Sequence, residues 1–145
     1  MSDSTQSPRE RGSQSGPDSP SRNILLVDDS DFERFTIRAA VEGLTQFRVC
    51  GEAANGVEAI EKAAQLKPDL VVMDLAMPLM NGLEAATVIK NALPGVPIVL
   101  LTLYAEQVHG PRSSAFGVVT VLSKVDGLAP LLECLDRLLG DSGSE

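Results

Sequence analysis

Five short apolar runs alternate with longer amphipathic segments along the chain, at residues 24–27, 47–50, 70–73, 98–102 and 118–122. Runs of this length that are apolar at nearly every position are typical of strands buried on both faces. Strands that alternate with helices form a parallel sheet with helices on both sides. We therefore predict an α/β fold with five strands in the flavodoxin-like, doubly wound order 2-1-3-4-5 and about five helices.

Three of the intervening segments carry apolar residues three or four positions apart, the spacing of one helix face. These residues are Phe32, Phe35 and Ala39; Val57, Ile60 and Ala64; and Ala86, Ile89 and Leu93. In the first segment, charged side chains occupy the opposite side, as in an amphipathic helix. The sequence thus predicts a helix after each of the first three strands.

The last two intervals differ from each other. Gly110-Pro111 would interrupt any helix that begins at Ala105, so we expect the fourth helix to be atypical: short, late or mobile. The final helix carries a leucine stripe from Leu128 to Leu139, with Asp126 as a candidate N-cap.

The first part of the 145-residue chain has a different composition from the rest. Residues 1–22 include seven Ser and three Pro and almost no apolar side chain. Such a segment cannot bury enough apolar surface to offset the entropy lost on ordering. We expect a disordered tail over 1–22, one domain over 23–140 and a short polar tail over 141–145.

The chain carries 12 Lys and Arg against 20 Asp and Glu, a net charge of −8. This balance disfavours a nucleic-acid binder, which needs a basic face, and adsorption to anionic membranes. No apolar run approaches the ~18 residues of a membrane span, and the N-terminus resembles no secretory signal. Cys50 and Cys134 stand in no metal motif and are expected to be buried thiols. We expect a cytoplasmic protein.

Reactive side chains stand at the ends of four of the five runs: Asp28 and Asp29, Asp74, Thr102, and Lys124. Because the carboxyl ends of parallel strands meet at one edge of a sheet, these groups should converge. Three carboxylates repel one another unless a cation lies between them, and oxygen ligands suit Mg²⁺. No His or Cys stands at these positions, which disfavours zinc or copper.

Four segments carry a family resemblance: LLVDDS (25–30), MDLAMPLMNGLEA (73–85), VLLT (99–102) and LSK (122–124). They resemble the receiver domain of bacterial two-component response regulators. The stretch PGVPIVLLTLYAE is most similar to receivers of the LuxR/NarL type. The resemblance spans about residues 23 to 140.

The resemblance implies a role for each strand-end residue. Asp74 would accept a phosphoryl group from a sensor histidine kinase or a phosphotransfer protein. Asp28, Asp29, Asp74 and the backbone carbonyl of Ala76 would hold Mg²⁺, and the side chains of Thr102 and Lys124 would bind phosphoryl oxygens. Such a protein is no enzyme beyond its own phosphorylation and slow dephosphorylation.

Five positions depart from the family pattern. Val121 replaces the aromatic residue usual three places before the lysine, and Val125 replaces the proline that often follows it. Leu103 is larger than the usual small residue after the threonine. Ala76 and Tyr104 stand where polar groups often orient water, so we predict slow hydrolysis of the phosphorylated form.

Other functions stay open on the sequence. A receiver-like docking module that works without phosphorylation would keep this fold, and Leu103 and Val121 favour it. Asp29-Ser30-Asp31 resembles the motif of haloacid-dehalogenase-like phosphohydrolases, although the further acidic pair of those enzymes is missing.

His109, beside Gly110-Pro111, is expected to be a surface loop residue. We expect a stand-alone regulator, a monomer or weak homodimer, that signals to an unknown downstream protein.

Overall fold

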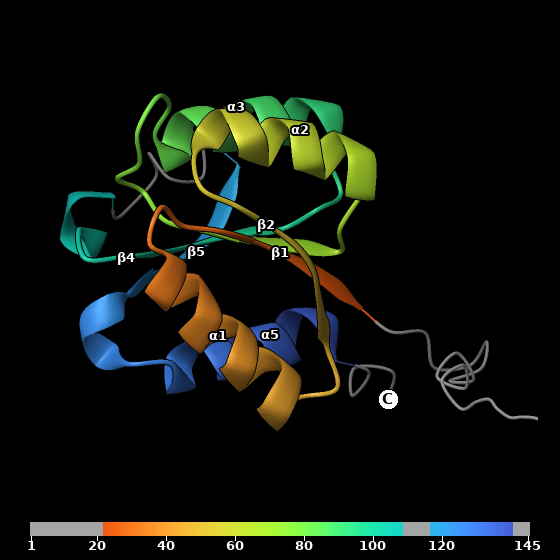
Figure 1. Ribbon diagram of the computed structural model, residues 1–145, viewed down its shortest axis with the longest axis vertical. Helices are drawn as coiled ribbons and strands as arrows, with labels where there is room; N and C mark the ends of the chain where they lie inside the picture. Colours follow the sequence, from red (N-terminus) through yellow and green to blue (C-terminus); the bar gives the residue numbers. More distant parts are fainter. Residues whose placement is uncertain (1–21, 109–116, 141–145) are drawn as a thin grey trace, which may run out of the picture.

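A single parallel sheet of five strands, in the order β2-β1-β3-β4-β5, forms the centre of the computed structural model (Figure 1). The structure describes residues 22–108 and 117–140. The strands are β1 (Asn23–Val27), β2 (Arg48–Ala53), β3 (Leu70–Met73), β4 (Ile98–Thr102) and β5 (Val118–Ser123). The predicted fold class and strand order are confirmed.

Helices cover both faces of the sheet. They are α1 (Asp31–Leu44), α2 (Gly56–Leu66), α3 (Gly82–Ala92) and α5 (Ala129–Leu139). In Figure 1, α1 and α5 lie on one face, and α2 and α3 on the other. None of the helices in the described part of the chain is long and apolar enough to cross a membrane.

The interval between β4 and β5 is atypical, as predicted. Among its described residues, Ala105–Val108 form a single 3-10 turn. His109 and Gly110-Pro111 lie outside the described residues, as do the two predicted tails apart from residue 22.

Two buried layers hold the helices on the sheet, because successive strand residues point to opposite faces. Ile24 and Leu26 of β1 pack in the layer of α1 and α5, where Leu135 is fully buried. Leu25 and Val27 pack in the layer of α2 and α3. This two-sided burial is the physical reason that the strands read as continuous apolar runs.

The prediction of which side of α1 packs on the sheet is wrong. Phe32 is 75% exposed and Phe35 is 69% exposed, and Ala39 is also exposed, whereas Ile37 and Val41 face the sheet. Residues 37 and 41 are four positions apart and so form a second apolar stripe, on the opposite side of the helix. Periodicity alone cannot choose between two apolar stripes.

Packing also differs from the sequence prediction in α2 and α5. In α2 the small residues Ala59 and Ala63 face the sheet, while Val57 is exposed. Asp126 ends a 3-10 turn, Lys124–Asp126, and does not cap α5, whose N-cap Leu128 makes no side-chain hydrogen bond. The leucine stripe of α5 is buried as predicted at residues 131, 135 and 139.

The two cysteines have different surroundings. Cys134 on α5 is buried, as predicted, but Cys50 on β2 is only partly buried. Burial raises the pKa of the Cys50 thiol, with a smaller contribution from the charge of Asp69. The prediction of two buried thiols is therefore right for one of them.

Candidate functional site

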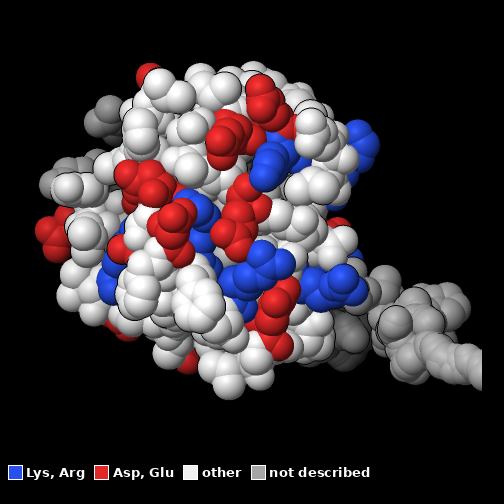
Figure 2. All heavy atoms as spheres, viewed as in Figure 1, with Lys and Arg blue, Asp and Glu red and all other residues white. Residues whose placement is uncertain are grey.

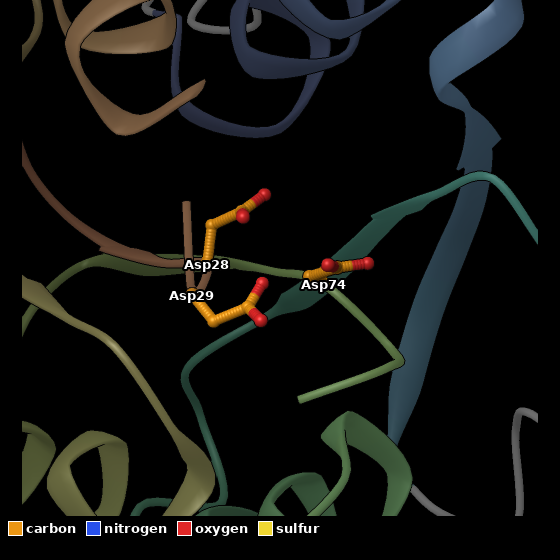
Figure 3. A group of neighbouring side chains, drawn as sticks. All are labelled: Asp28, Asp29 and Asp74. Atoms are coloured by element: carbon orange, nitrogen blue, oxygen red, sulfur yellow. The ribbon is translucent and has the colours of Figure 1, made fainter. Parts of the chain in front are cut away.

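Three carboxylates meet at the carboxyl edge of the sheet (Figure 3). Asp28 and Asp29 follow β1, and Asp74 follows β3, the neighbouring strand. Each offers an oxygen within 4.8 Å of the others. Asp28 and Asp74 are buried, whereas Asp29 is exposed. The structure thus brings together the acidic residues predicted from the strand ends.

Lys124, at the end of β5, reaches into this group. Its Nζ lies 2.8 Å from Oδ2 of Asp28 and 3.4 Å from Oδ2 of Asp74. A third hydrogen bond goes to Oε1 of Glu33, in the first turn of α1. The sequence did not point to this role, because Glu33 is one of the charged side chains of the first predicted amphipathic helix.

Burial and neighbouring charges set the pKa values of these groups. Burial raises the pKa of Asp74, and the charge of Asp28 adds to this, while Lys124 opposes both. Burial alone would lower the pKa of Lys124, but its hydrogen bonds to Asp28 and Glu33 and the charge of Asp74 raise it overall. The ammonium therefore stays charged at neutral pH and partly neutralises the carboxylates.

Thr102 is fully buried at the end of β4, the strand that pairs with β3. Its Oγ1 accepts a hydrogen bond of 3.1 Å from the N–H of Tyr104. Leu103 and Tyr104 themselves are largely exposed. Val121, which stands where related receivers usually carry an aromatic residue, is partly buried. Together with Leu103 it lines an open hollow at the surface.

The segment after Asp74 turns sharply into α3. The N–H of Gly82 donates a hydrogen bond of 2.8 Å to the carbonyl of Leu75. A Cβ at residue 82 would lie only 2.2 Å from the carbonyl oxygen of Asp74, so this position requires glycine. Ala76 is exposed in this segment. The Asn-Gly pair of the motif thus has a structural reason: Asn81 caps α3, and Gly82 permits the close approach.

An ion-pair network fixes the end of β1 from the side of α1. Arg34 Nη1 donates a hydrogen bond of 2.6 Å to the backbone carbonyl of Asp28. Its Nε lies 2.9 Å from Oε1 of Glu52, and Arg38 Nη1 lies 2.6 Å from Oε2 of the same residue. Figure 2 shows acidic and basic side chains interleaved on this face of the molecule.

We predict that Glu52→Gln lowers stability at neutral pH by about 1–2 kcal/mol, because two charge-assisted hydrogen bonds are weakened. Burial alone would raise the pKa of Glu52, but its hydrogen bonds with Arg38 and Arg34 lower it overall. A lowered carboxyl pKa stabilises the fold above the unfolded value, roughly 4.3, and this contribution is lost as the pH falls through the folded pKa.

Urea unfolding of both proteins between pH 7 and pH 3 measures this difference. The gap between Glu52→Gln and wild type should shrink as the pH falls. Glu61→Gln, an exposed change on α2, should leave stability nearly unchanged. A gap that is independent of pH would contradict the assigned ion pairs.

Comparison with known proteins places this site in a family. The sequence model of one protein family, the response regulator receiver domain, matches residues 24–136 of this chain. Response regulator protein VraR of Staphylococcus aureus is 41% identical over 114 residues, covering 79% of this chain and 54% of that protein. VraR of Staphylococcus saprophyticus is 37% identical over the same length and with the same coverage. The chain thus spans about half the length of these curated relatives.

Solved structures of response regulators have the same fold as this chain. The response regulator domain of Thermotoga maritima CheB gives a TM-score of 0.75 at 29% identity, covering 82% of this chain and 96% of that one. A LuxR-family two-component response regulator from Aurantimonas sp. SI85-9A1 gives a TM-score of 0.76 at 27% identity, covering 83% of this chain and 86% of that one. Proteins of this kind are signalling modules, which sets aside the phosphohydrolase alternative. The chain belongs to the response regulator receiver domain family.

Proposed function

We propose that this domain receives a phosphoryl group on Asp74 from a sensor histidine kinase or a phosphotransfer protein and signals through contacts with another protein. The observation that carries the proposal is the site of Asp74 itself. Its buried carboxylate lies beside two further acidic residues and within 3.4 Å of the Lys124 ammonium. Membership of the receiver family supports the same assignment.

The side chains around Asp74 suit phosphoryl transfer. A carboxylate oxygen of Asp74 attacks the phosphorus of a phosphohistidine; the new O–P bond forms as the N–P bond breaks, and the imidazole nitrogen keeps the electron pair. The Lys124 ammonium and the Thr102 hydroxyl, which both lie at this edge of the sheet, bind oxygens of the transferred group. Positioning and charge neutralisation provide most of the catalysis in such a transfer.

The donor set fits Mg²⁺, which prefers oxygen ligands. Asp28, Asp29 and Asp74, with the backbone carbonyl of Ala76, would hold the ion. Asp29 is exposed and offers a carboxylate oxygen within 4.8 Å of those of Asp28 and Asp74, so it can share a cation with them. When bound, the ion neutralises negative charge on the phosphoryl oxygens.

The test is intact mass after incubation with Mg²⁺ and acetyl phosphate. Wild type should gain one phosphoryl group, whereas Asp74→Asn and wild type in excess EDTA should gain none. Uptake by Asp74→Asn would overturn the assignment of the acceptor. A folded wild-type protein that binds Mg²⁺ but gains nothing from acetyl phosphate or from candidate kinases would favour the docking module that works without phosphorylation.

We predict that the phosphorylated form hydrolyses slowly, over minutes or longer. Neither the methyl group of Ala76 nor the ring of Tyr104 can orient a water molecule for attack on the phosphoryl group as a shorter polar side chain would. Removing the donor and following intact mass gives the half-life. Ala76→Asn, which adds a polar group, should shorten it, and a wild-type half-life of seconds would contradict the prediction.

The proposal places this domain in the cytoplasm, as a monomer or weak homodimer. Its partners are proteins, because the acidic charge balance disfavours nucleic acid as the direct target.

A further inference from the structure

The Lys124 ammonium uses all of its hydrogen-bonding capacity within the site. A lysine ammonium has three N–H donors, and Nζ has three acceptors here, on Asp28, Glu33 and Asp74. Lys124 therefore cannot bind a phosphoryl oxygen until one of these carboxylates releases it. The rate of phosphorylation therefore depends on how readily one of the three carboxylates releases the Lys124 ammonium.

Glu33 differs from the other two acceptors. Asp28 and Asp74 belong to the acidic group that can hold a cation, and Asp74 carries the phosphoryl group after transfer, so both gain another partner. Glu33 lies outside that group and offers Lys124 only a competing negative charge. Its side chain is 39% exposed, so it can move into solvent when it is displaced.

The position of the Glu33 carboxylate has a specific local cause. Ser30 caps α1 and Glu33 follows three residues later, the spacing of a capping box, in which the glutamate accepts from the N–H of the cap residue. Half of the box is present: the Glu33 N–H donates to Ser30 Oγ at 3.2 Å. The Ser30 N–H instead donates to Asp28 Oδ1 at 3.0 Å. Asp28 therefore replaces the glutamate as the acceptor.

The corresponding glutamate of α3 shows the alternative. Glu84 Oε1 accepts from the N–H of its cap residue, Asn81, at 3.0 Å, and Asn81 Oδ1 accepts from the N–H of Glu84 at 2.9 Å. This capping box is complete, and Glu84 makes no hydrogen bond to the phosphorylation site among the described residues. The two glutamates occupy the same helix position but hold different partners.

We propose that Glu33 is a positioning residue that holds Lys124 in the unphosphorylated protein and competes with the incoming phosphoryl group for its ammonium. This inference rests on the proposed function of Asp74. Two anionic groups that contact one ammonium repel each other, so phosphorylation displaces the Glu33 carboxylate. If Asp28 releases the Ser30 N–H, that N–H can donate instead to the displaced Glu33 carboxylate, which would complete the capping box.

The test is the rate of phosphoryl uptake, measured by intact mass at several acetyl phosphate concentrations with saturating Mg²⁺. Glu33→Gln should accelerate uptake by roughly three- to tenfold, the range expected when a charge-assisted hydrogen bond is weakened to one with a neutral amide oxygen. Glu33→Asp keeps the charge but shortens the side chain by one methylene, and it should accelerate uptake by a smaller factor. Glu84→Gln removes the same charge from the same helix position and should match wild type.

Each outcome separates the two proposals. Equal rates for wild type and Glu33→Gln, with normal uptake in both, would overturn the role of Glu33 alone. Equal acceleration by Glu84→Gln would reduce the effect to net charge and would also overturn it. Failure of every variant to gain a phosphoryl group would contradict the proposed function of Asp74, and the role of Glu33 with it.

Discussion

Gly82→Ala is expected to destabilise the protein by about 2–4 kcal/mol, although alanine is the better helix former by about 1 kcal/mol. An added Cβ would lie 2.2 Å from the carbonyl oxygen of Asp74 and 3.1 Å from the Cα of Leu75. These are backbone atoms, so no side-chain rotation relieves the clash. Either α3 or the segment that carries Asp74 must shift, and we expect phosphoryl uptake to fall with stability.

Gly43→Ala is the matched control. Gly43 lies in the last turn of α1, and nothing lies within 4 Å of a Cβ added there. The same substitution should therefore be neutral or stabilising by up to about 1 kcal/mol. Urea unfolding of both variants measures the contrast. A Gly82→Ala protein as stable as wild type would contradict the close approach of α3 to Asp74.

Lys124→Met is expected to lower stability by about 2–3 kcal/mol in the absence of Mg²⁺, because three neighbouring carboxylates lose their shared cation. The pKa of Lys124 is raised in the fold. Its stabilising contribution is therefore fully present at neutral pH, and is lost only as the pH rises through the folded pKa. Phosphoryl uptake should fall at least tenfold, because the phosphoryl oxygens lose a cationic partner.

Mg²⁺ distinguishes this cause from a general packing defect. An ion bound by the acidic residues should restore more stability to Lys124→Met than to wild type, since it supplies the missing positive charge. Lys67→Met removes the same charge at an exposed site after α2, and should change stability little with or without Mg²⁺. Thermal unfolding across a Mg²⁺ titration gives the comparison. An equal gain in all three proteins would contradict the proposed charge balance.

The fold and the centre of the site could be predicted because both depend on strand pattern. Strands buried on two faces leave continuous apolar runs, and their carboxyl ends necessarily meet at one edge. Asp28 and Asp74 come together because β1 and β3 are neighbours, with Val27 paired to Met73 directly before them. Residues far apart in sequence were therefore predictable as neighbours.

The contribution of α1 could not be predicted, because it depends on how the helix is rotated about its axis. The helix has apolar residues on two sides, and packing chose Ile37 and Val41 over the two phenylalanines. The same rotation brings Glu33 to Lys124. The spacing of Ser30 and Glu33 is that of a capping box, but the carboxylate of Asp28 takes the Ser30 N–H. Such competition between acceptors appears only in three dimensions.

The location of the phosphoryl group tests the central claim most directly. After incubation with Mg²⁺ and acetyl phosphate, borohydride reduces an aspartyl phosphate, but not a free carboxylate, to the alcohol and so converts the residue to homoserine. Peptide mass mapping should find this conversion at residue 74 and nowhere else. Homoserine at residue 28 or 29, or modification of a serine in its place, would contradict the assignment of Asp74 as the acceptor.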